Sequence, residues 1–130
     1  MPASTDSPAV SVARAHIEAW SNHDWDAARA RLAADVTVDA TTTLPIMAAT
    51  HLTGAGPYME GLIQFAQAVT PGSATVLSAV GDERNALVML TVEANLGHGA
   101  MTLPAARMYL IDEAGQITAE QVIFFATPAA

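Results

Sequence analysis

Residues 13–40 contain three hydrophobic patterns in succession, and their order constrains the fold more than any other feature of the sequence. The first pattern is helical, and one face of that helix collects Val12, His16, Ile17 and Trp20. The second begins at Asp24, a residue type that favours helix N-termini, and continues as a short helix whose inward stripe is Trp25, Ala28 and Leu32. The third is an alternation of Val36 and Val38 with polar residues, which is strand spacing. The sequence therefore predicts two helices that lead into a strand.

The rest of the chain predicts one more helix and then a sheet. A short strand is expected at 50–53, and a third helix follows from Gly54 with Tyr58, Leu62, Phe65 and Val69 on one side. Four apolar-rich segments with short turns between them are then expected as strands: 73–80, 86–96, 100–111 and 116–126. Helices early and strands late indicate an α+β fold, in which about three N-terminal helices pack on one face of a strongly curved, mostly antiparallel sheet.

Length and composition limit the class of protein. At 130 residues we expect one domain over 10–126, with flexible tails at 1–9 and 127–130, able to bury roughly 70% of its unfolded surface. The net charge of −8, with five arginines and no lysine, argues against nucleic acid and anionic membranes as partners, because both require a basic surface. There is no cysteine, no signal-peptide pattern and no apolar run of membrane-spanning length, so a cytoplasmic protein is expected.

Three short motifs carry a resemblance to a known family. They are Trp20-Ser-Asn-His-Asp24, Ala34-Asp35-Val36 and Asp112-Glu-Ala-Gly115-Gln-Ile117. With this order of elements, the chain resembles the SnoaL-like branch of the nuclear-transport-factor-2-like superfamily, whose members include ketosteroid isomerases, scytalone dehydratase, limonene epoxide hydrolase and polyketide cyclases. The resemblance covers about residues 10–126 and implies a cone-shaped roll with an apolar pocket between sheet and helices, usually dimeric. It does not imply one activity, since function lies in the site.

The residues of ketosteroid isomerase can be compared with this chain position by position. That enzyme uses a carboxylate base and an oxyanion hole of a tyrosine and a protonated aspartate. By an ungapped alignment from the first helix, the tyrosine position falls on His16, the base on Ala40 and the protonated aspartate on Arg107. All three are replaced, so that residue set is not expected to operate here. The Asp–Arg–Asp triad of limonene epoxide hydrolase is not visible either, although Arg107 and Glu120 imitate part of it.

The last two strands suggest a candidate site. A hairpin centred on 112–115 predicts the cross-strand pairs Arg107 with Glu120, Tyr109 with Thr118 and Ala105 with Val122, and places Phe124 on the same face. In the family, this is the face that lines the pocket. One interpretation is an ion pair near the mouth, which contributes little if it is exposed. The other is that Arg107 orients a carboxylate, enolate or carbonyl oxygen while Glu120 positions it or moves a proton.

The four histidines have separate interpretations. His16 is either a hydrogen-bonded core residue or a general acid/base, for which its ordinary pKa would suit. His23 is expected at a surface turn and His98 at a hairpin tip, while His51 either lines the pocket mouth or ends a strand. No spacing typical of metal ligands occurs, so neither a metal nor a cofactor is expected. Asp39 should point away from the pocket.

The leading interpretation is a protein with a pocket for small molecules. It is expected to be a lyase, isomerase or hydrolase acting on an apolar oxygenated compound, polyketide- or steroid-like, by acid/base chemistry with His16, Arg107 and Glu120. The candidate ligand-binding residues are Trp20, Tyr58, Leu62, Phe65, Tyr109, Val122 and Phe124. The alternative is a non-catalytic ligand-binding or dimeric accessory protein, in which the apolar stripes are simply core.

A homodimer through the sheet is also expected. The outward sheet face carries, in one register or the other, Met101, Leu103, Met108, Leu110 or Ile123. A sheet with two apolar faces must cover the second one.

Overall fold

The computed structural model describes residues 6–42, 50–95, 97 and 99–124, and it contains three helices and six strands in that part of the chain. The elements in chain order are α1 Pro8–Ser21, α2 Trp25–Ala30, β1 Leu32–Thr42, β2 Thr50–Thr53, α3 Ala55–Ala66, β3 Thr75–Gly81, β4 Asn85–Asn95, β5 Ala100–Ile111 and β6 Ile117–Phe124. The predicted C-terminal tail, most of the predicted N-terminal tail and the turn residue His98 lie outside the described residues.

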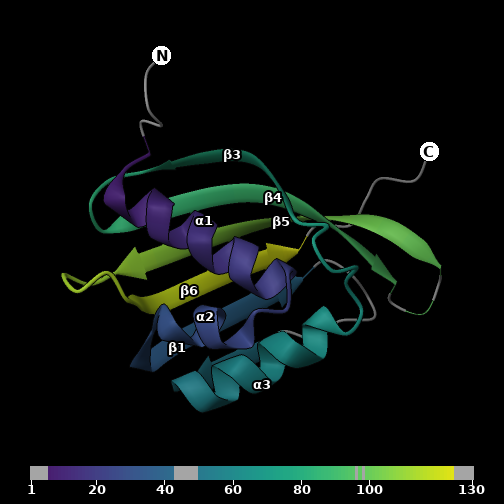
Figure 1. Ribbon diagram of the computed structural model, residues 1–130, viewed down its shortest axis with the longest axis horizontal. Helices are drawn as coiled ribbons and strands as arrows, with labels where there is room; N and C mark the ends of the chain where they lie inside the picture. Colours follow the sequence, from purple (N-terminus) through teal and green to yellow (C-terminus); the bar gives the residue numbers. More distant parts are fainter. Residues whose placement is uncertain (1–5, 43–49, 96, 98, 125–130) are drawn as a thin grey trace.

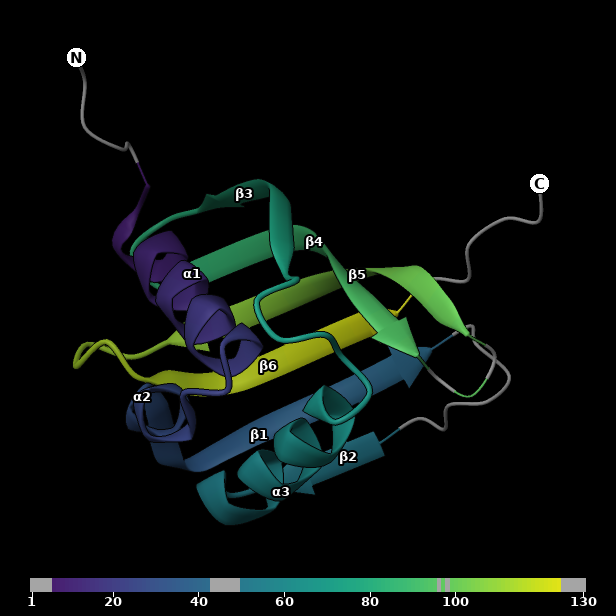
Figure 2. The same ribbon diagram turned by 45° about the vertical axis from the view of Figure 1, so that its right-hand side comes forward.

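The strands form one mixed sheet in the order β2-β1-β6-β5-β4-β3. Neighbouring strands are antiparallel except β1 and β6, which run parallel. All three helices lie on the same face of this sheet (Figures 1 and 2), so the molecule has one layer of helices and one of strands. The predicted α+β fold is therefore confirmed, and so is the antiparallel meander of β4, β5 and β6.

Local signals explain where the first two helices begin. Ser7 accepts a hydrogen bond from the Val10 amide at 3.3 Å, and Pro8 occupies the first turn, where its missing N–H costs nothing. α1 thus starts inside the segment predicted as a tail, and Ala9 is already buried against the core. Asp24 accepts from the Ala27 amide at 3.3 Å, which confirms the predicted cap of α2.

The register of the last hairpin differs from the prediction. The observed partners are Arg107 with Val122, Tyr109 with Glu120 and Ala105 with Phe124. Arg107 and Glu120 are consequently diagonal neighbours instead of direct partners. A shift of two residues leaves every side chain on its predicted face, because side chains alternate with a period of two.

Two irregularities near the turn account for this shift. Ile111 pairs with Ile117, so the connection contains the five residues 112–116 and is one residue longer than the predicted turn. Leu110 then pairs with Ala119, which leaves Thr118 as an extra residue in a bulge. Each irregularity shifts the strand pairing by one residue. The two shifts together leave every side chain on the face of the sheet that was predicted for it.

The two faces of the sheet differ in their surroundings. The covered face is a packed core that includes Val36, Val88, Leu90, Leu103 and Ile117. The open face exposes seven large apolar side chains, Leu77, Val80, Leu87, Met89, Met108, Leu110 and Ile123. Strand alternation separates these two sets, with interruptions at the bulges of Leu77 and Thr118.

Two glycines should respond to alanine substitution with opposite sign. Gly115 has a φ of +79° in the β5–β6 connection, so we expect Gly115→Ala to lower the free energy of unfolding by about 1 kcal/mol through backbone strain. At Gly56 in α3 no atom lies within 4 Å of the position that a Cβ would take, so Gly56→Ala should raise the free energy of unfolding by about 0.5 kcal/mol. Urea denaturation measures both values, and a stabilising Gly115→Ala would contradict the observed turn.

Candidate functional site

A buried ion pair lies on the covered face of the sheet. Arg107 comes from β5 and Glu120 from β6, and their side chains are only 5% and 0% exposed. The Arg107 Nη1 donates to Glu120 Oε2 at 2.5 Å. The two residues therefore contact each other as the sequence suggested, but in the core and not at an exposed mouth. Buried charges of this kind require further partners, because desolvation is costly.

Two helices supply those partners. The Tyr58 hydroxyl, from α3, donates a hydrogen bond to Glu120 Oε1. The guanidinium carbon of Arg107 lies 4.8 Å from the ring centroid of Trp20, from α1, which is a cation–π arrangement. Both charges of the pair are thus contacted from the helix layer as well as from the sheet.

Burial shifts the pKa values of Glu120 and Arg107 in opposite directions. Burial raises the pKa of Glu120 well above the ordinary carboxyl value, and it lowers the pKa of Arg107. The contact between the two charges opposes both changes, because each favours the ionised form of the other. Arginine stays protonated at neutral pH even so. A carboxyl group with a raised pKa is suited to accept and return a proton near neutrality.

His16 lies fully buried beside this pair. Its ring is 5.9 Å from the Tyr58 ring and 6.2 Å from the Tyr109 ring, both in edge-on geometry. Burial, and to a smaller extent the positive charges of Arg107 and Arg31, lower the pKa of His16 to about 3. The imidazole is therefore neutral at pH 7. A neutral ring can donate one hydrogen bond and accept another, whereas an imidazolium would add a second buried cation.

We call the six residues His16, Trp20, Tyr58, Arg107, Tyr109 and Glu120 the buried cluster. Several of its polar atoms are buried without a hydrogen-bond partner among the described residues: His16 Nδ1 and Nε2, Trp20 Nε1, Arg107 Nε and the Tyr109 hydroxyl. Burial raises the pKa of Tyr109, so its hydroxyl keeps its proton. The positive charge of the nearby Arg107 opposes this rise, although the two side chains form no well-aligned hydrogen bond. Unpartnered buried polar groups are rare in proteins, and each calls for an explanation such as a catalytic role or a bound water or ion.

The apolar residues predicted to bind a ligand lie beside the cluster. Leu62, Val122 and Phe124 are buried, and Phe65 is partly buried. The Phe65 ring is 6.2 Å from the Trp20 ring and 5.2 Å from the Phe124 ring. All seven residues predicted from the sequence therefore belong to the covered side of the sheet, where an aromatic wall adjoins a polar cluster.

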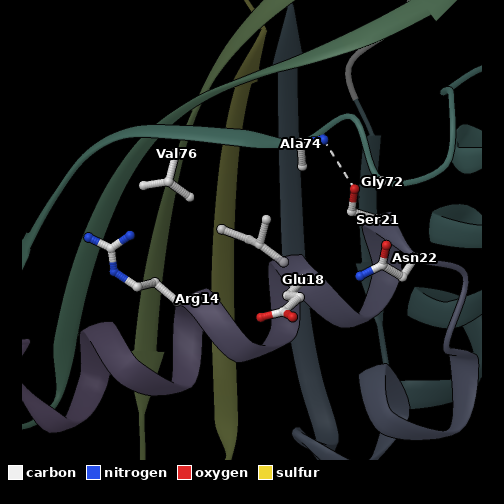
Figure 3. A pocket seen from close by; sticks show the side chains of 8 residues that line it. Arg14, Glu18, Ser21, Asn22, Gly72, Ala74 and Val76 are labelled. Carbon is white, nitrogen blue, oxygen red and sulfur yellow. Dashed lines mark hydrogen bonds between the residues drawn. The ribbon is translucent and has the colours of Figure 1, made fainter. Parts of the chain in front are cut away.

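A separate groove lies between α1 and β3 (Figure 3), with a volume of about 300 Å³. Its lining residues are Arg14, Ile17, Glu18, Ser21, Asn22, Gly72, Ala74 and Val76. Figure 3 shows the Ser21 hydroxyl accepting a hydrogen bond from the Ala74 amide, at 3.1 Å, so this side chain already joins the two walls. Arg14 is likewise engaged, since its Nε lies 2.7 Å from Asp6 Oδ2. None of the lining residues belongs to the buried cluster.

The remaining polar candidates lie on the open face of the sheet. Asp39 is exposed as predicted, and its Oδ1 is 2.5 Å from His51 Nδ1. The other His51 nitrogen is 3.4 Å from the Thr53 hydroxyl. His51 therefore does not line the covered face. Among the described residues, no group of three or more potential metal ligands occurs.

Sequence reasoning found the members of the cluster, but among their contacts it predicted only the one between Arg107 and Glu120. It grouped Arg107 and Glu120 from hairpin spacing, and it placed His16 on the same side by helical periodicity. The hydrogen bond from Tyr58 to Glu120 spans 62 positions along the chain, and no local pattern could have indicated it. The only available signal was that a tyrosine on an apolar helix face needs a partner for its hydroxyl.

Comparison with known proteins identifies the family. The SnoaL-like domain matches residues 13–120, so this chain belongs to the SnoaL-like family, as its motifs suggested. No curated protein sequence matches it.

Within the described residues, no helix has the length and apolarity to cross a membrane.

Solved structures extend this result to the fold. A protein from Kribbella flavida is 27% identical over 93% of this chain and 88% of its own, with a TM-score of 0.75. An LEH-like epoxide hydrolase of Mycobacterium tuberculosis is 18% identical over 90% of this chain and 82% of its own, with a TM-score of 0.69. A second M. tuberculosis protein, in complex with estradiol-17beta-hemisuccinate, is 17% identical over 90% and 93%, with a TM-score of 0.71. The last two are similar to this chain in fold alone.

The low pKa of His16 predicts acid sensitivity. Its pKa in the folded protein lies below the ordinary 6.5, so the unfolded chain takes up the proton first as the pH falls. The folded state should lose about 3 kcal/mol of stability from this residue between pH 7 and pH 4. His16→Phe should remove that part of the pH dependence, measured by urea denaturation at both pH values.

A histidine at the surface provides the control for this prediction. His23 occupies an exposed turn with a φ of 59°, a conformation that asparagine tolerates, so His23→Asn removes an imidazole without disturbing the core. It should change the pH dependence far less than His16→Phe. Equal pH dependence in the wild type and His16→Phe would show that His16 is not a buried neutral imidazole.

Proposed function

We propose that this SnoaL-like domain binds an apolar, oxygenated small molecule against the buried cluster and moves a proton on it. The observation that carries the proposal is Glu120, a fully buried carboxylate held by Arg107 and Tyr58 next to polar atoms that have no partner. The stability of the fold does not require such an arrangement, because an apolar residue of similar size would fill the same space without the desolvation penalty of a buried charge. The solved structures of an epoxide hydrolase and of a protein in complex with a steroid hemisuccinate support an apolar, oxygenated ligand.

Each member of the cluster has a role in this proposal. Glu120 takes a proton from a carbon next to a carbonyl group, and the electron pair of the broken C–H bond moves onto the carbonyl oxygen. Arg107 and the neutral imidazole of His16 stabilise the charge on that oxygen, with Tyr109 as an accessory donor. Glu120 then returns the proton to a different carbon of the conjugated enolate, which completes an isomerisation, or to a departing oxygen whose C–O bond breaks, which completes an elimination. The aromatic wall of Trp20, Phe65 and Phe124, with Leu62 and Val122, holds the apolar body of the ligand.

A second candidate function is ligand binding without catalysis. Both oxygens of Glu120 already accept hydrogen bonds, from Tyr58 and from Arg107. A carboxylate that stays in this arrangement holds the two strands and α3 together, and the cluster then orients a ligand without reacting with it. The two functions differ in one measurable property, the exchange of substrate protons with solvent.

The test of catalysis uses a methyl ketone, 2-acetylnaphthalene, in deuterated buffer. If Glu120 is the base, the protein should accelerate the loss of the methyl proton signal in NMR, and Glu120→Gln should reduce the catalysed rate at least about 100-fold. The rate should rise with pH as Glu120 ionises, and the rise should lie above the ordinary carboxyl range because burial raises the pKa of Glu120.

The same change at a distant carboxylate serves as the control. Glu60 is exposed on α3, so Glu60→Gln should leave the exchange rate unchanged. If the ketone binds and no exchange occurs, the non-catalytic function holds. If Glu60→Gln and Glu120→Gln have equal effects, the base is not Glu120.

We also propose that the protein is a homodimer joined through the open face of the sheet. The argument is the exposure of large apolar side chains on β3–β6, among them Met108 at 49% and Leu110 at 47%. Removing such a patch from water favours association.

Met108→Glu should therefore weaken the dimer at least tenfold, because the new carboxylate would be buried at the interface. Analytical ultracentrifugation measures the dissociation constant. Gln64→Glu adds the same charge on the exposed side of α3 and should have no effect. A wild-type monomer at micromolar concentration would contradict the dimer.

A further inference from the structure

We infer that the buried cluster selects neutral ligands that carry an oxygen acceptor and excludes carboxylates; this inference rests on the proposed function. Arg107 alone would favour an anion, and the sequence left carboxylate, enolate and carbonyl oxygens equally open. The contacts within the cluster distinguish between these ligands by charge and by hydrogen-bonding capacity.

The charge of the cluster is balanced when Glu120 is ionised, the form that its contact with Arg107 favours. Arg107 is its cation and Glu120 its anion, with 2.5 Å between Nη1 and Oε2. An incoming carboxylate would meet Glu120 as well as Arg107, and the cluster would then hold two negative charges against one positive. A net charge in a desolvated site is unfavourable, whereas a neutral ligand leaves the balance unchanged.

The unpartnered atoms are mainly donors. The Trp20 indole N–H and the Arg107 Nε–H can only donate, and the Tyr109 hydroxyl and one nitrogen of the neutral His16 can donate as well. On the acceptor side, both oxygens of Glu120 already take hydrogen bonds. The cluster therefore offers more donors than acceptors, and a carbonyl or ether oxygen matches this surplus better than an amine or an alcohol.

The surroundings favour an apolar body on the same ligand. Trp20 contacts Arg107 with its ring face and meets the Phe65 ring in a T-shaped arrangement, so the polar cluster adjoins the aromatic wall directly. Phe65 in turn contacts Phe124. A ligand that meets both regions carries its oxygen next to a flat or bulky apolar group.

Paired probes of the same shape test the inference. We would titrate the wild-type protein at pH 7 with 2-acetylnaphthalene and 2-naphthoate, and with acetophenone and benzoate, by calorimetry. Each ketone should bind at least tenfold more tightly than its carboxylate. Glu120→Gln removes the anion and leaves Arg107 uncompensated, so naphthoate should then bind at least tenfold more tightly than it does to the wild type. Glu120→Asp keeps the charge and should keep the preference for ketones.

The outcomes separate this inference from the proposed function. If wild-type protein binds the carboxylates as tightly as the ketones, or if Glu120→Gln does not gain affinity for naphthoate while its circular dichroism is native, the inference is wrong and the proposed site stands. If ketones are preferred but no proton exchange occurs, the inference holds for a non-catalytic binding protein. If none of the four probes binds to the wild type, the ligand site fails and the inference with it.

Discussion

The buried ion pair between Arg107 and Glu120 constrains the residues packed around it, because both charges need partners inside the core. Two charges removed from water lose several kcal/mol of solvation each, and their mutual attraction offsets this only when other groups satisfy the remaining donors and acceptors. Tyr58 satisfies one carboxylate oxygen, and the face of Trp20 covers the guanidinium. Since these four residues come from β5, β6, α3 and α1, the pair connects the sheet to two of the three helices. Loss of either charge would leave the other buried without compensation.

The cluster is more polar than a core of this size requires. Alongside the ion pair it buries an imidazole, an indole N–H and a phenol whose polar atoms have no partner among the described residues. The low pKa of His16 has the same origin, because burial disfavours the charged imidazolium and the positive charge of Arg107 disfavours it further. Proteins depart from apolar packing in this way chiefly at functional sites, where stability is lost in exchange for chemistry.

The two faces of the sheet carry different sets of side chains. The covered face carries the ion pair and the aromatic wall, while the open face carries exposed apolar side chains on β3–β6 and the Asp39–His51 pair on β1 and β2. Strand alternation makes this division possible, because neighbouring residues such as Met108 and Tyr109 point to opposite faces. The proposed ligand site and the proposed dimer surface therefore lie on opposite faces of the sheet.

The sequence by itself determined the elements and their faces. Helical periodicity placed His16 and Trp20 inward, Asp24 capped its helix, and the period of two placed Arg107, Tyr109 and Glu120 on one side of the sheet. These features are local, since each depends on residues within a few positions of one another. Only the tertiary structure decided the register, where a longer turn and a bulge at Thr118 moved the pairing by two residues. It alone also joined Tyr58 to Glu120 and Trp20 to Arg107, and it buried the cluster, which shifts the pKa values of His16 and Glu120. Contacts and burial of this kind depend on segments that lie far apart in the sequence, and no local pattern encodes which of them will meet.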